Sequence, residues 1–403
     1  MFDRIYDRQV SAARADLQTS FRLTGDRPRV GIIPPAIPGS VGDAAMISAT
    51  AAYWYDHGAE YVDLLYGKDW PLDVQFRRKI PSSGFFYGGS AKQHVAILRA
   101  LKQYTHLYFI GADVIDGAYN PKSVNRRLSL IRDFAASGSV ARVLGASYNE
   151  TPEITTQQSL ANMPAGVEIC ARDPVSFARL DEVEGIVPRQ VADLAFLLKP
   201  QPDNAHAVAA NRWIAQQKAE GRQVVALNAN YLQIAKEPKL KEALPIIVQR
   251  FIDAGLALLL VPHDSRTDEP DAFHLKAAVA GLAPEFADRT YLIEAISPGA
   301  IKASLANVDL LVTGRLHAQI LAMGSGTPVI SLAYQGKFEG LLQLFEINPD
   351  DLLVTPKSVA VDPHGFADHV IAMLPKAGEL RRKISDRMPF ITSMSQRNFT
   401  NDQ

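Results

Sequence analysis

Short apolar runs alternate with helical segments along almost the whole chain, and this alternation limits the fold more than any other feature. The first half contains several such runs, among them RVGIIPP, YVDLL, THLYFIGAD and VARVLGAS. Helical segments separate them, with apolar residues at helical spacing. Buried strands joined by helices predict a parallel sheet that carries helices on both faces. The expected fold class is therefore α/β, with doubly wound parallel sheets.

The alternation is interrupted once, at residues 199–206. This stretch reads KPQPDNAH and combines two prolines with polar side chains. The alternation then restarts with RQVVALNAN and LALLLVPH, and a length of 403 residues also favours two domains, at about 100–200 residues each. We therefore expect two Rossmann-like domains facing a central cleft, over residues 1–200 and 201–375. A closing helix over residues 376–403 is expected to pack back across them.

Charge and cysteine content exclude several classes of protein. The chain has 42 basic and 43 acidic residues, so it lacks the basic excess that is typical of a nucleic-acid partner. One cysteine, Cys170, cannot form a disulfide framework or a cysteine-rich metal site. No secretory signal and no apolar run near ~20 residues is visible, which predicts a cytoplasmic protein without a transmembrane segment. A peripheral association with a membrane enzyme complex stays open.

Residues 309–337 form the most informative stretch, DLLVTGRLHAQILAMGSGTPVISLAYQGK. An apolar strand ends at Gly314, a helix follows, and Gly324 stops that helix before the next strand. Arg315 and His317 fall where the strand turns into the helix. A helix N-terminus favours anions, so a guanidinium and an imidazole there predict an anion site with a titratable group. The alternative is an arginine paired with a surface carboxylate beside a structural histidine.

Further polar residues follow other predicted strands, at the edge where sites form in α/β sheets. Each also has a structural explanation; Asp43, for example, can cap its helix. Their coincidence on one edge of two sheets is what favours a functional role. The candidates are Gly42, Asp43, Asp113, Asn149, Arg172, His263 and Asp264.

Several common motifs are absent from the sequence. There is no phosphate-binding loop of the Gly-x-x-x-x-Gly-Lys-Ser/Thr type, and no Gly-x-Gly-x-x-Gly follows the first strand. These absences disfavour a P-loop enzyme and a nicotinamide dehydrogenase. No histidine or cysteine spacing indicates a zinc site.

Residues 312–342 resemble the Arg-x-His-Ala segment of the polysaccharide pyruvyl transferase family, with its Gly-x-Pro strand and downstream lysine. Further stretches support the resemblance in order, over roughly residues 29–345: SVGDAAMI, FIGADVIDG, EICARDPVSFARL, the RQVADLAFLL strand and VPHDSRTDE. The chain departs from the family at Ser40, where asparagine is frequent, and at Ala112, where many members are glycine-rich. Both departures lie in the predicted N-terminal domain.

The resemblance implies a fold like that of GT-B glycosyltransferases and transfer of the pyruvyl group of phosphoenolpyruvate to two hydroxyls of a sugar. The product is a pyruvate ketal on a polysaccharide or its precursor, with release of phosphate. The acceptor sugar can be an oligosaccharide, lipid-linked or nucleotide-linked. The N-terminal domain would hold this acceptor and the C-terminal domain the donor, with no cofactor and no metal required.

We expect His317 to act as the catalytic acid/base and Arg315 to hold the phosphate and stabilise its departure. Arg172 and Lys337 would bind the donor, and Leu316 is a further substrate-binding candidate. The other candidates would bind substrate: Gly42, Asp43, Asp113, Asn149, His263 and Asp264. Among them, His263, Asp264 and Asp43 would activate or position the acceptor hydroxyls.

Two other functions fit the same sequence. A nucleotide-sugar glycosyltransferase or epimerase with this architecture would use Arg315 and His317 to bind a diphosphate. A non-catalytic protein of a polysaccharide-assembly complex would keep the fold without the reaction.

Overall fold

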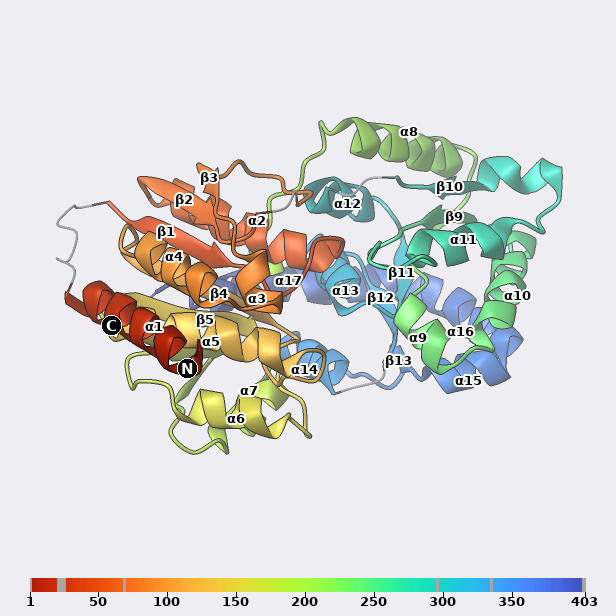
Figure 1. Ribbon diagram of the computed structural model, residues 1–403. Coiled ribbons are helices and arrows are strands. Elements are labelled where there is room, and N and C mark those ends of the chain that lie inside the picture. Colours follow the sequence, from red (N-terminus) through yellow and green to blue (C-terminus); the bar gives the residue numbers. More distant parts are fainter. Residues whose placement is uncertain (1, 20–26, 68–69, 295–296, 334–335, 401–403) are drawn as a thin grey trace.

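The computed structural model describes residues 2–19, 27–67, 70–294, 297–333 and 336–400. The described chain forms two α/β domains that lie side by side (Figure 1). Each domain contains one sheet whose strands pair in parallel, because long connections, most of which contain a helix, join successive strands. The expected architecture of two doubly wound parallel sheets is confirmed.

The N-terminal sheet has the strand order β3-β2-β1-β4-β5-β6-β7. Its strands are β1 (Arg29–Ile33), β2 (Tyr61–Leu64), β3 (Arg78–Lys79), β4 (His106–Ala112), β5 (Val140–Ala146), β6 (Glu168–Ala171) and β7 (Pro188–Gln190). The helices of this half are α1 (Phe2–Thr19), α2 (Val41–Asp56), α3 (Ser83–Tyr87), α4 (Ala91–Leu101), α5 (Pro121–Ala135), α6 (Ile154–Ala161), α7 (Pro174–Asp181) and the 3₁₀ helix η1 (Leu194–Leu197).

The C-terminal sheet has the order β10-β9-β8-β11-β12-β13. Its strands are β8 (Val224–Leu227), β9 (Ala257–Leu260), β10 (Thr290–Leu292), β11 (Leu310–Thr313), β12 (Val329–Leu332) and β13 (Leu353–Val354). The helices are α8 (Ala205–Ala219), α9 (Tyr231–Lys236), α10 (Leu240–Asp253), α11 (Asp271–Val279), η2 (Pro284–Arg289), α12 (Pro298–Leu305), α13 (Leu316–Met323), α14 (Lys337–Leu344), α15 (Pro356–Val361), α16 (Pro363–Met373), η3 (Leu374–Lys376) and α17 (Ala377–Gln396).

In both sheets the order in which successive strands are added reverses at one point. This point lies between β1 and β4 in the first sheet and between β8 and β11 in the second. At such a point the loops leave the strand ends in opposite directions and open a crevice. The two crevices meet, because the loop after β1 pairs with the loop after β9. Ser40 and Asp264 form an antiparallel bridge, and the Val41 amide donates to the His263 carbonyl over 3.0 Å.

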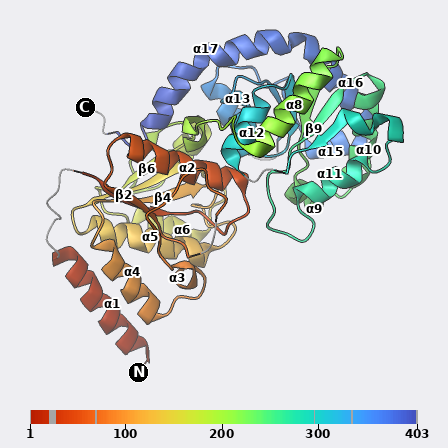
Figure 2. The same cartoon turned by 90° about the horizontal axis from the view of Figure 1, so that it is seen from above.

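Helix α17 leaves the C-terminal domain and returns to the N-terminal one (Figure 2). Just beyond it, the Asn398 side chain accepts from the Gly145 amide and donates to the Ala192 carbonyl, both over 3.0 Å. Asn398 is fully buried, so these bonds tie the chain end into the first sheet.

One predicted strand is shorter than expected. The RQVADLAFLL segment continues β7 only to Gln190, and residues 194–197 form η1 instead. The Asp193 carboxylate accepts from the Ala195 amide over 2.8 Å and thereby caps this 3₁₀ turn. The apolar residues of this segment therefore form a buried turn instead of a strand, and the turn begins with the acidic side chain of Asp193.

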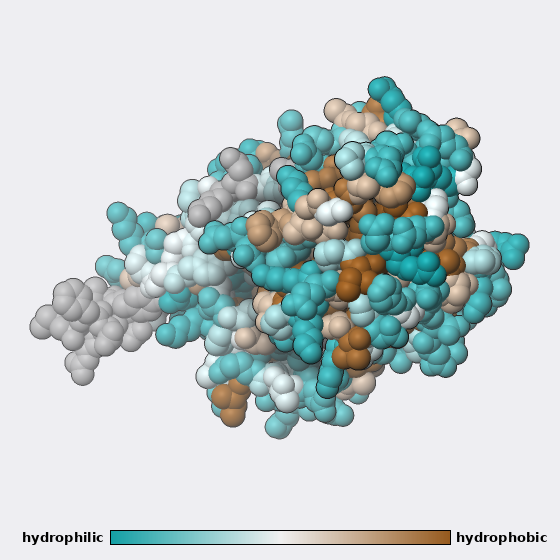
Figure 3. Space-filling model, turned by 90° about the vertical axis from the view of Figure 1, so that its right-hand side faces the viewer, coloured by the Kyte–Doolittle hydropathy of each residue, from teal (hydrophilic) through white to brown (hydrophobic). Residues whose placement is uncertain are grey.

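The surface of the C-terminal domain shows apolar areas interspersed among hydrophilic side chains (Figure 3). Within the described part of the chain, no helix combines the length and the apolar character that a membrane span requires.

Candidate active site

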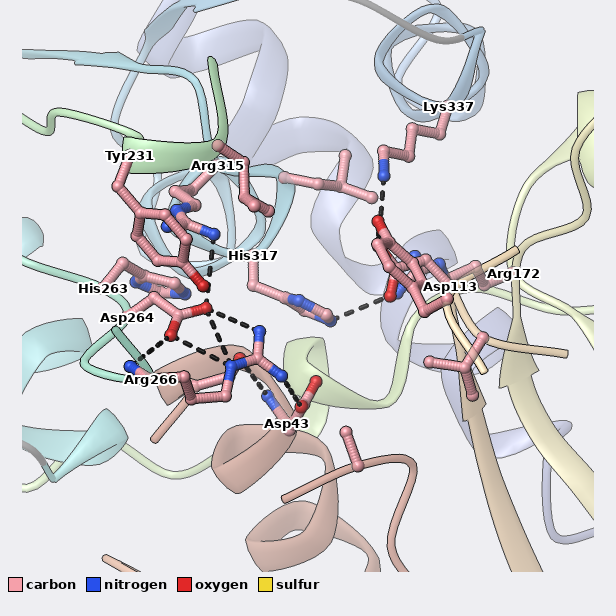
Figure 4. A pocket seen from close by; sticks show the side chains of 16 residues that line it. Asp43, Asp113, Arg172, Tyr231, His263, Asp264, Arg266, Arg315, His317 and Lys337 are labelled. Atoms are coloured by element: carbon pink, nitrogen blue, oxygen red, sulfur yellow. Dashed lines mark hydrogen bonds and ion pairs between the residues drawn. The ribbon is translucent and has the colours of Figure 1, made fainter. Parts of the chain in front are cut away.

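A cavity of about 230 Å³ lies between the two domains (Figure 4). Its walls come from the loops and helix starts that follow β1, β4 and β6 on one side and β8, β9, β11 and β12 on the other. Four cationic side chains line it, Arg172, Arg266, Arg315 and Lys337. They alternate with three carboxylates, Asp43, Asp113 and Asp264, and with the imidazoles of His263 and His317.

Arg315 is the N-cap residue of α13, as the sequence predicted for the strand–helix junction. Its Nη2 and Nε donate to Asp271 over 2.7 and 3.2 Å, and its Nη1 donates to Asp264 over 3.3 Å. Its guanidinium also lies 4.7 Å from the ring centre of Tyr231. Two carboxylates and an aromatic face thus fix the guanidinium in one orientation at the cavity wall.

His317 lies in the first turn of α13 and points toward the N-terminal domain. Its Nε2 is 3.2 Å from Arg172 Nη1 and 3.5 Å from Asp193 Oδ2. The other side of the ring packs against Gly42, where a Cβ atom would collide with the imidazole. Gly42 therefore contributes by allowing the close approach of His317 and is not itself part of the cavity lining.

Arg172 forms a buried ion pair with Asp193, with 2.8 Å between Nη1 and Oδ2. Its Nε donates to Ser147 over 2.8 Å. Burial raises the pKa of Asp193, but the charges of His317 and Arg172 outweigh burial and hold this pKa at about 2. Asp193 is thus a fixed negative charge behind both side chains.

Lys337 begins α14 and reaches across the cleft to Asp113, with 3.3 Å between Nζ and Oδ2. The same carboxylate oxygen accepts from the Tyr119 hydroxyl over 3.3 Å. Burial opposes ionisation of Asp113, yet Lys337 and Arg172 bring its pKa well below the usual range. The two domains therefore face each other through charged groups at the cavity.

On the opposite side of His317, Arg266 binds Asp264 through Nε at 3.0 Å and Nη2 at 2.6 Å. Its Nη1 lies 3.5 Å from Asp43 of the other domain. Burial raises the pKa of Asp43, although Arg266 and His317 act against it. The N-cap of α2 is Ser40 and not Asp43, since the Ser40 Oγ accepts from the Asp43 amide over 3.2 Å. The Asp43 carboxylate thus faces the cavity.

His263 lines the same wall with only 3% of its surface exposed. Neither of its ring nitrogens has a hydrogen-bond partner among the residues that the structure describes. Burial, and then the positive charges of His317, Arg315 and Arg266, lower its pKa well below the usual value. The imidazole is therefore neutral.

Of the two remaining candidates, one lines the cavity and the other does not. Leu316 lines the cavity beside Arg315. Asn149 lies outside the cavity lining, and its amide donates to Asp116. Among the residues with described placement, no group of three or more His, Cys, Asp or Glu side chains is arranged to hold a metal ion.

Sequence reasoning missed four side chains that shape the site: Asp193, Arg266, Asp271 and Tyr231. Arg266 and Tyr231 each follow a strand of the second sheet, so the strand-end rule could have found them. Asp271 begins α11 and contacts Arg315 only through the tertiary fold, and Asp193 was hidden inside an apolar run.

A sequence model of the family described as polysaccharide pyruvyl transferase matches residues 41–336, well over half of the chain. The chain belongs to the polysaccharide pyruvyl transferase family. This membership identifies a transferase of polysaccharide biosynthesis. A comparison with curated proteins gives no match.

Solved structures resemble this pyruvyl transferase family member over nearly its whole length. Sucrose-phosphate synthase from Thermosynechococcus elongatus has a TM-score of 0.55 at 17% identity, covering 92% of this chain and 97% of its own. UDP-GlcNAc 2-epimerase from Neisseria meningitidis, bound to UDP-GlcNAc, has a TM-score of 0.55 at 10% identity, covering 91% and 98%. At such identities the likeness shows the fold, which is that of GT-B glycosyltransferases.

The two departures from the family pattern now have a structural meaning. Ser40 caps α2 through its side-chain oxygen, a task that asparagine performs equally well. Ala112 has a positive φ of 45°, a conformation that suits glycine and costs an alanine roughly 1 kcal/mol. A glycine would adopt this conformation just before Asp113 without that cost.

Proposed function

We propose that the protein transfers the pyruvyl group of phosphoenolpyruvate to two hydroxyls of a sugar, forming a cyclic ketal and releasing phosphate. One observation carries the proposal: in a member of the pyruvyl transferase family, four cationic side chains from both domains surround His317 in one cavity. Phosphoenolpyruvate carries a carboxylate and a phosphate, so it needs several fixed positive groups. The acceptor would be an oligosaccharide, free, lipid-linked or nucleotide-linked.

The donor's two anionic groups have distinct partners in this proposal. Arg315 and the N-terminus of α13 would hold the phosphate, because the guanidinium is already fixed and the helix start favours an anion. Arg172 and Lys337 would hold the carboxylate from the other side. Lys337 would then exchange Asp113 for the donor.

The reaction begins with proton transfer from His317 to the methylene carbon, which leaves positive charge on the central carbon. One sugar hydroxyl attacks that carbon, and the bond from carbon to the phosphate oxygen breaks. The second hydroxyl then forms the second carbon–oxygen bond of the ketal. Arg315 stabilises the departing phosphate throughout.

The cationic side chains are also the reason to expect no metal cofactor. Three arginines and a lysine supply the positive charge that Mg²⁺ supplies at many phosphate sites. Dialysis against a chelator should leave the rate within about twofold of the untreated protein. A rate that falls with chelation and returns with a divalent ion would contradict this part of the proposal.

Phosphate release from phosphoenolpyruvate across a panel of sugar acceptors tests the function. The parent protein should release phosphate only when a suitable acceptor is present. His317→Ala should lower the rate by roughly 10²–10⁴-fold, the usual contribution of an acid/base group. A folded His317→Ala protein that releases phosphate at the parent rate would contradict the assignment of His317 as the acid/base group.

Melting curves with ligands separate the alternatives. Phosphoenolpyruvate should raise the melting temperature more than UDP- or GDP-sugars do, since a ligand stabilises only the state that binds it. Stabilisation by a nucleotide sugar alone would favour a glycosyltransferase or epimerase. Stabilisation by phosphoenolpyruvate without phosphate release for any acceptor would favour a non-catalytic role. Peripheral membrane association, proposed only for a lipid-linked acceptor, can be tested by sedimentation with vesicles that carry it.

A further inference from the structure

We propose that the ring of Tyr119 is the platform on which a neutral sugar ring of the acceptor stacks, at the mouth of the cavity. This inference rests on the proposed function, because it concerns the acceptor half of the same site. A sugar ring has an apolar face of C–H groups and a rim of hydroxyls. It is therefore bound best by an aromatic surface that lies beside hydrogen-bonding groups.

The two walls of the cavity differ in chemistry. Of the four cationic side chains in the described lining, Arg266, Arg315 and Lys337 belong to the C-terminal domain. The N-terminal domain adds Arg172 but otherwise contributes apolar, aromatic or acidic side chains and one serine hydroxyl, those of Ala36, Val114, Tyr119, Asp43, Asp113 and Ser40. The two anionic groups of the donor fit the cationic wall, and a neutral, hydroxyl-rich ring fits the opposite one.

Tyr119 belongs to the crevice of the N-terminal sheet. It lies in the loop that follows β4, whereas Ala36 and Ile37 follow β1, the strand that pairs with β4. These two strands flank the point where the strand order reverses, which is where α/β sheets bind their ligands. Ile37 is 43% exposed, and Val114 of the β4 loop lines the cavity. Both loops therefore offer apolar side chains at this edge of the sheet.

Tyr119 connects the cavity with the protein surface. Its side chain lines the cavity, yet 58% of its surface is exposed. The described lining contains one further tyrosine, Tyr231, which is partly buried and has the Arg315 guanidinium 4.7 Å from its ring centre. One sugar of an acceptor chain can therefore stack on the accessible ring of Tyr119 while the other sugars of the chain stay in solvent.

Hydrogen bonds hold the loop that carries Tyr119 in one conformation. The Asp116 carboxylate accepts from the Ala118 amide over 2.9 Å through one oxygen and from the Asn149 side chain through the other. The Tyr119 hydroxyl itself donates to Asp113 over 3.3 Å. Because these bonds orient the ring before a ligand arrives, little conformational freedom is lost when a sugar stacks on it.

The bond to Asp113 places the Tyr119 platform beside the donor. One oxygen of Asp113 accepts both from the Tyr119 hydroxyl and from Lys337, each over 3.3 Å, and Figure 4 shows Lys337 reaching this carboxylate. In the proposed function Lys337 exchanges Asp113 for the donor carboxylate. Asp113 then keeps Tyr119 and has lone pairs left for a sugar hydroxyl. A sugar stacked on Tyr119 thus lies next to the donor, as ketal formation requires.

Replacement of Tyr119 in the full chain tests the proposal, with the neutral sugar of the panel that supports the fastest phosphate release as the probe. Tyr119→Ala should raise KM for this sugar roughly tenfold. The value of kcat and KM for phosphoenolpyruvate should stay within about threefold. Tyr119→Phe keeps the ring and should keep the parent KM, whereas Tyr119→Leu, apolar but not aromatic, should resemble the alanine variant. Phe390→Ala, at an exposed aromatic position of α17, is the matched control and should keep all parent constants.

Fluorescence tests stacking without turnover. Tyr119→Trp places an indole at the same position, and titration with the same sugar should change its emission, with the parent protein as the control for the three native tryptophans. An unchanged emission, a folded Tyr119→Ala protein with the parent KM, or a Tyr119→Phe protein as weak as the alanine variant would overturn the inference and leave the proposed function intact. If the parent protein itself releases no phosphate with any acceptor, the proposed function fails first and the inference falls with it.

Discussion

The Arg172–Asp193 ion pair offers one ring nitrogen of His317 two different partners. Nη1 of Arg172 lies 3.2 Å from Nε2 and can donate to it when the imidazole is neutral. Oδ2 of Asp193 lies 3.5 Å from the same nitrogen and can accept from it when the imidazole is protonated. The ring can thus keep one orientation in both protonation states, as an acid/base group requires.

Asp193→Asn should therefore slow catalysis more than it weakens donor binding. The amide keeps an acceptor for the Ala195 amide but removes the charge that supports protonated His317. We expect kcat to fall roughly tenfold to a thousandfold, while KM for phosphoenolpyruvate changes less. Steady-state kinetics separate the two constants, and Asp193→Glu should recover part of the rate. A folded Asp193→Asn protein with the parent kcat would rule out this positioning role.

At the scale of single residues, the sequence indicated side chains that follow strands and missed several of the residues that they pair with. Arg315, His317, Asp43 and Lys337 were all found from local pattern or resemblance, and the structure brings them to one cavity. Two of their carboxylate partners, Asp113 and Asp264, were candidates as well, but Asp271 and Asp193 were not, because an ion pair such as Arg315–Asp271 joins residues that only the tertiary fold makes neighbours. The position of residues at strand ends predicts where a site lies. The tertiary fold then determines which charged side chains are paired with each other and which can contact a ligand.

Among the elements, α12 is notable because the other domain caps it. Asp73 lies in the loop after β2, and its carboxylate accepts from the Gly299 amide over 2.6 Å and from the Ser297 hydroxyl over 2.5 Å. A side chain of the N-terminal domain therefore satisfies one backbone amide at the start of a C-terminal-domain helix. This contact joins the loop after β2 of one domain to α12 of the other.

Loss of this cap should weaken the join between the domains. Asp73→Ala should lower the free energy of unfolding by about 0.5–2 kcal/mol, the usual cost of a lost N-cap. Asp73→Asn retains an acceptor oxygen and should lose less. Urea unfolding followed by circular dichroism measures the difference. Equal stability of the alanine variant and the parent protein would show that the Ser297 cap suffices on its own.

Element boundaries were predictable where one pattern dominated. The helix between β11 and β12 ends at Met323, one residue before the predicted glycine stop. The segment after β7 was not predictable, since its apolar residues fit a buried strand as well as a buried 3₁₀ turn. The cap formed by Asp193, two residues before Ala195, decides in favour of the turn.

At the scale of the whole molecule, the alternating pattern was enough to predict two doubly wound sheets, but not how they meet. The contacts that join them link residues far apart in the chain, such as Gly39 with Ser265 and Asp113 with Lys337. No local period encodes these pairs. The cleft follows from the sheet topology, and its width follows from these few cross-domain contacts.

The stability of the whole protein should depend on two histidines of the N-terminal domain, His94, which is buried, and His106, which is partly buried. Burial lowers the pKa of both His94 and His106 to about 4, with help from Arg14 near His94 and from Arg142 near His106. In the unfolded chain a histidine titrates near 6.5. Below that pH the two histidines bind protons in the unfolded state but stay neutral in the folded state. The stabilisation is therefore complete above about pH 6.5 and is lost as the pH falls toward 4.

Each histidine should cost roughly 1–2 kcal/mol of unfolding free energy between about pH 7.5 and pH 5. Urea unfolding at both pH values measures this loss, and Trp54 fluorescence reports it directly because its ring centre lies 4.8 Å from that of His106. Carboxylates also titrate as the pH falls, so the informative quantity is the difference between the parent and a His94→Gln, His106→Gln double variant. The variant should be less stable at neutral pH but should lose less on acidification. An equal loss in both proteins would show that carboxylates, and not these imidazoles, govern acid sensitivity.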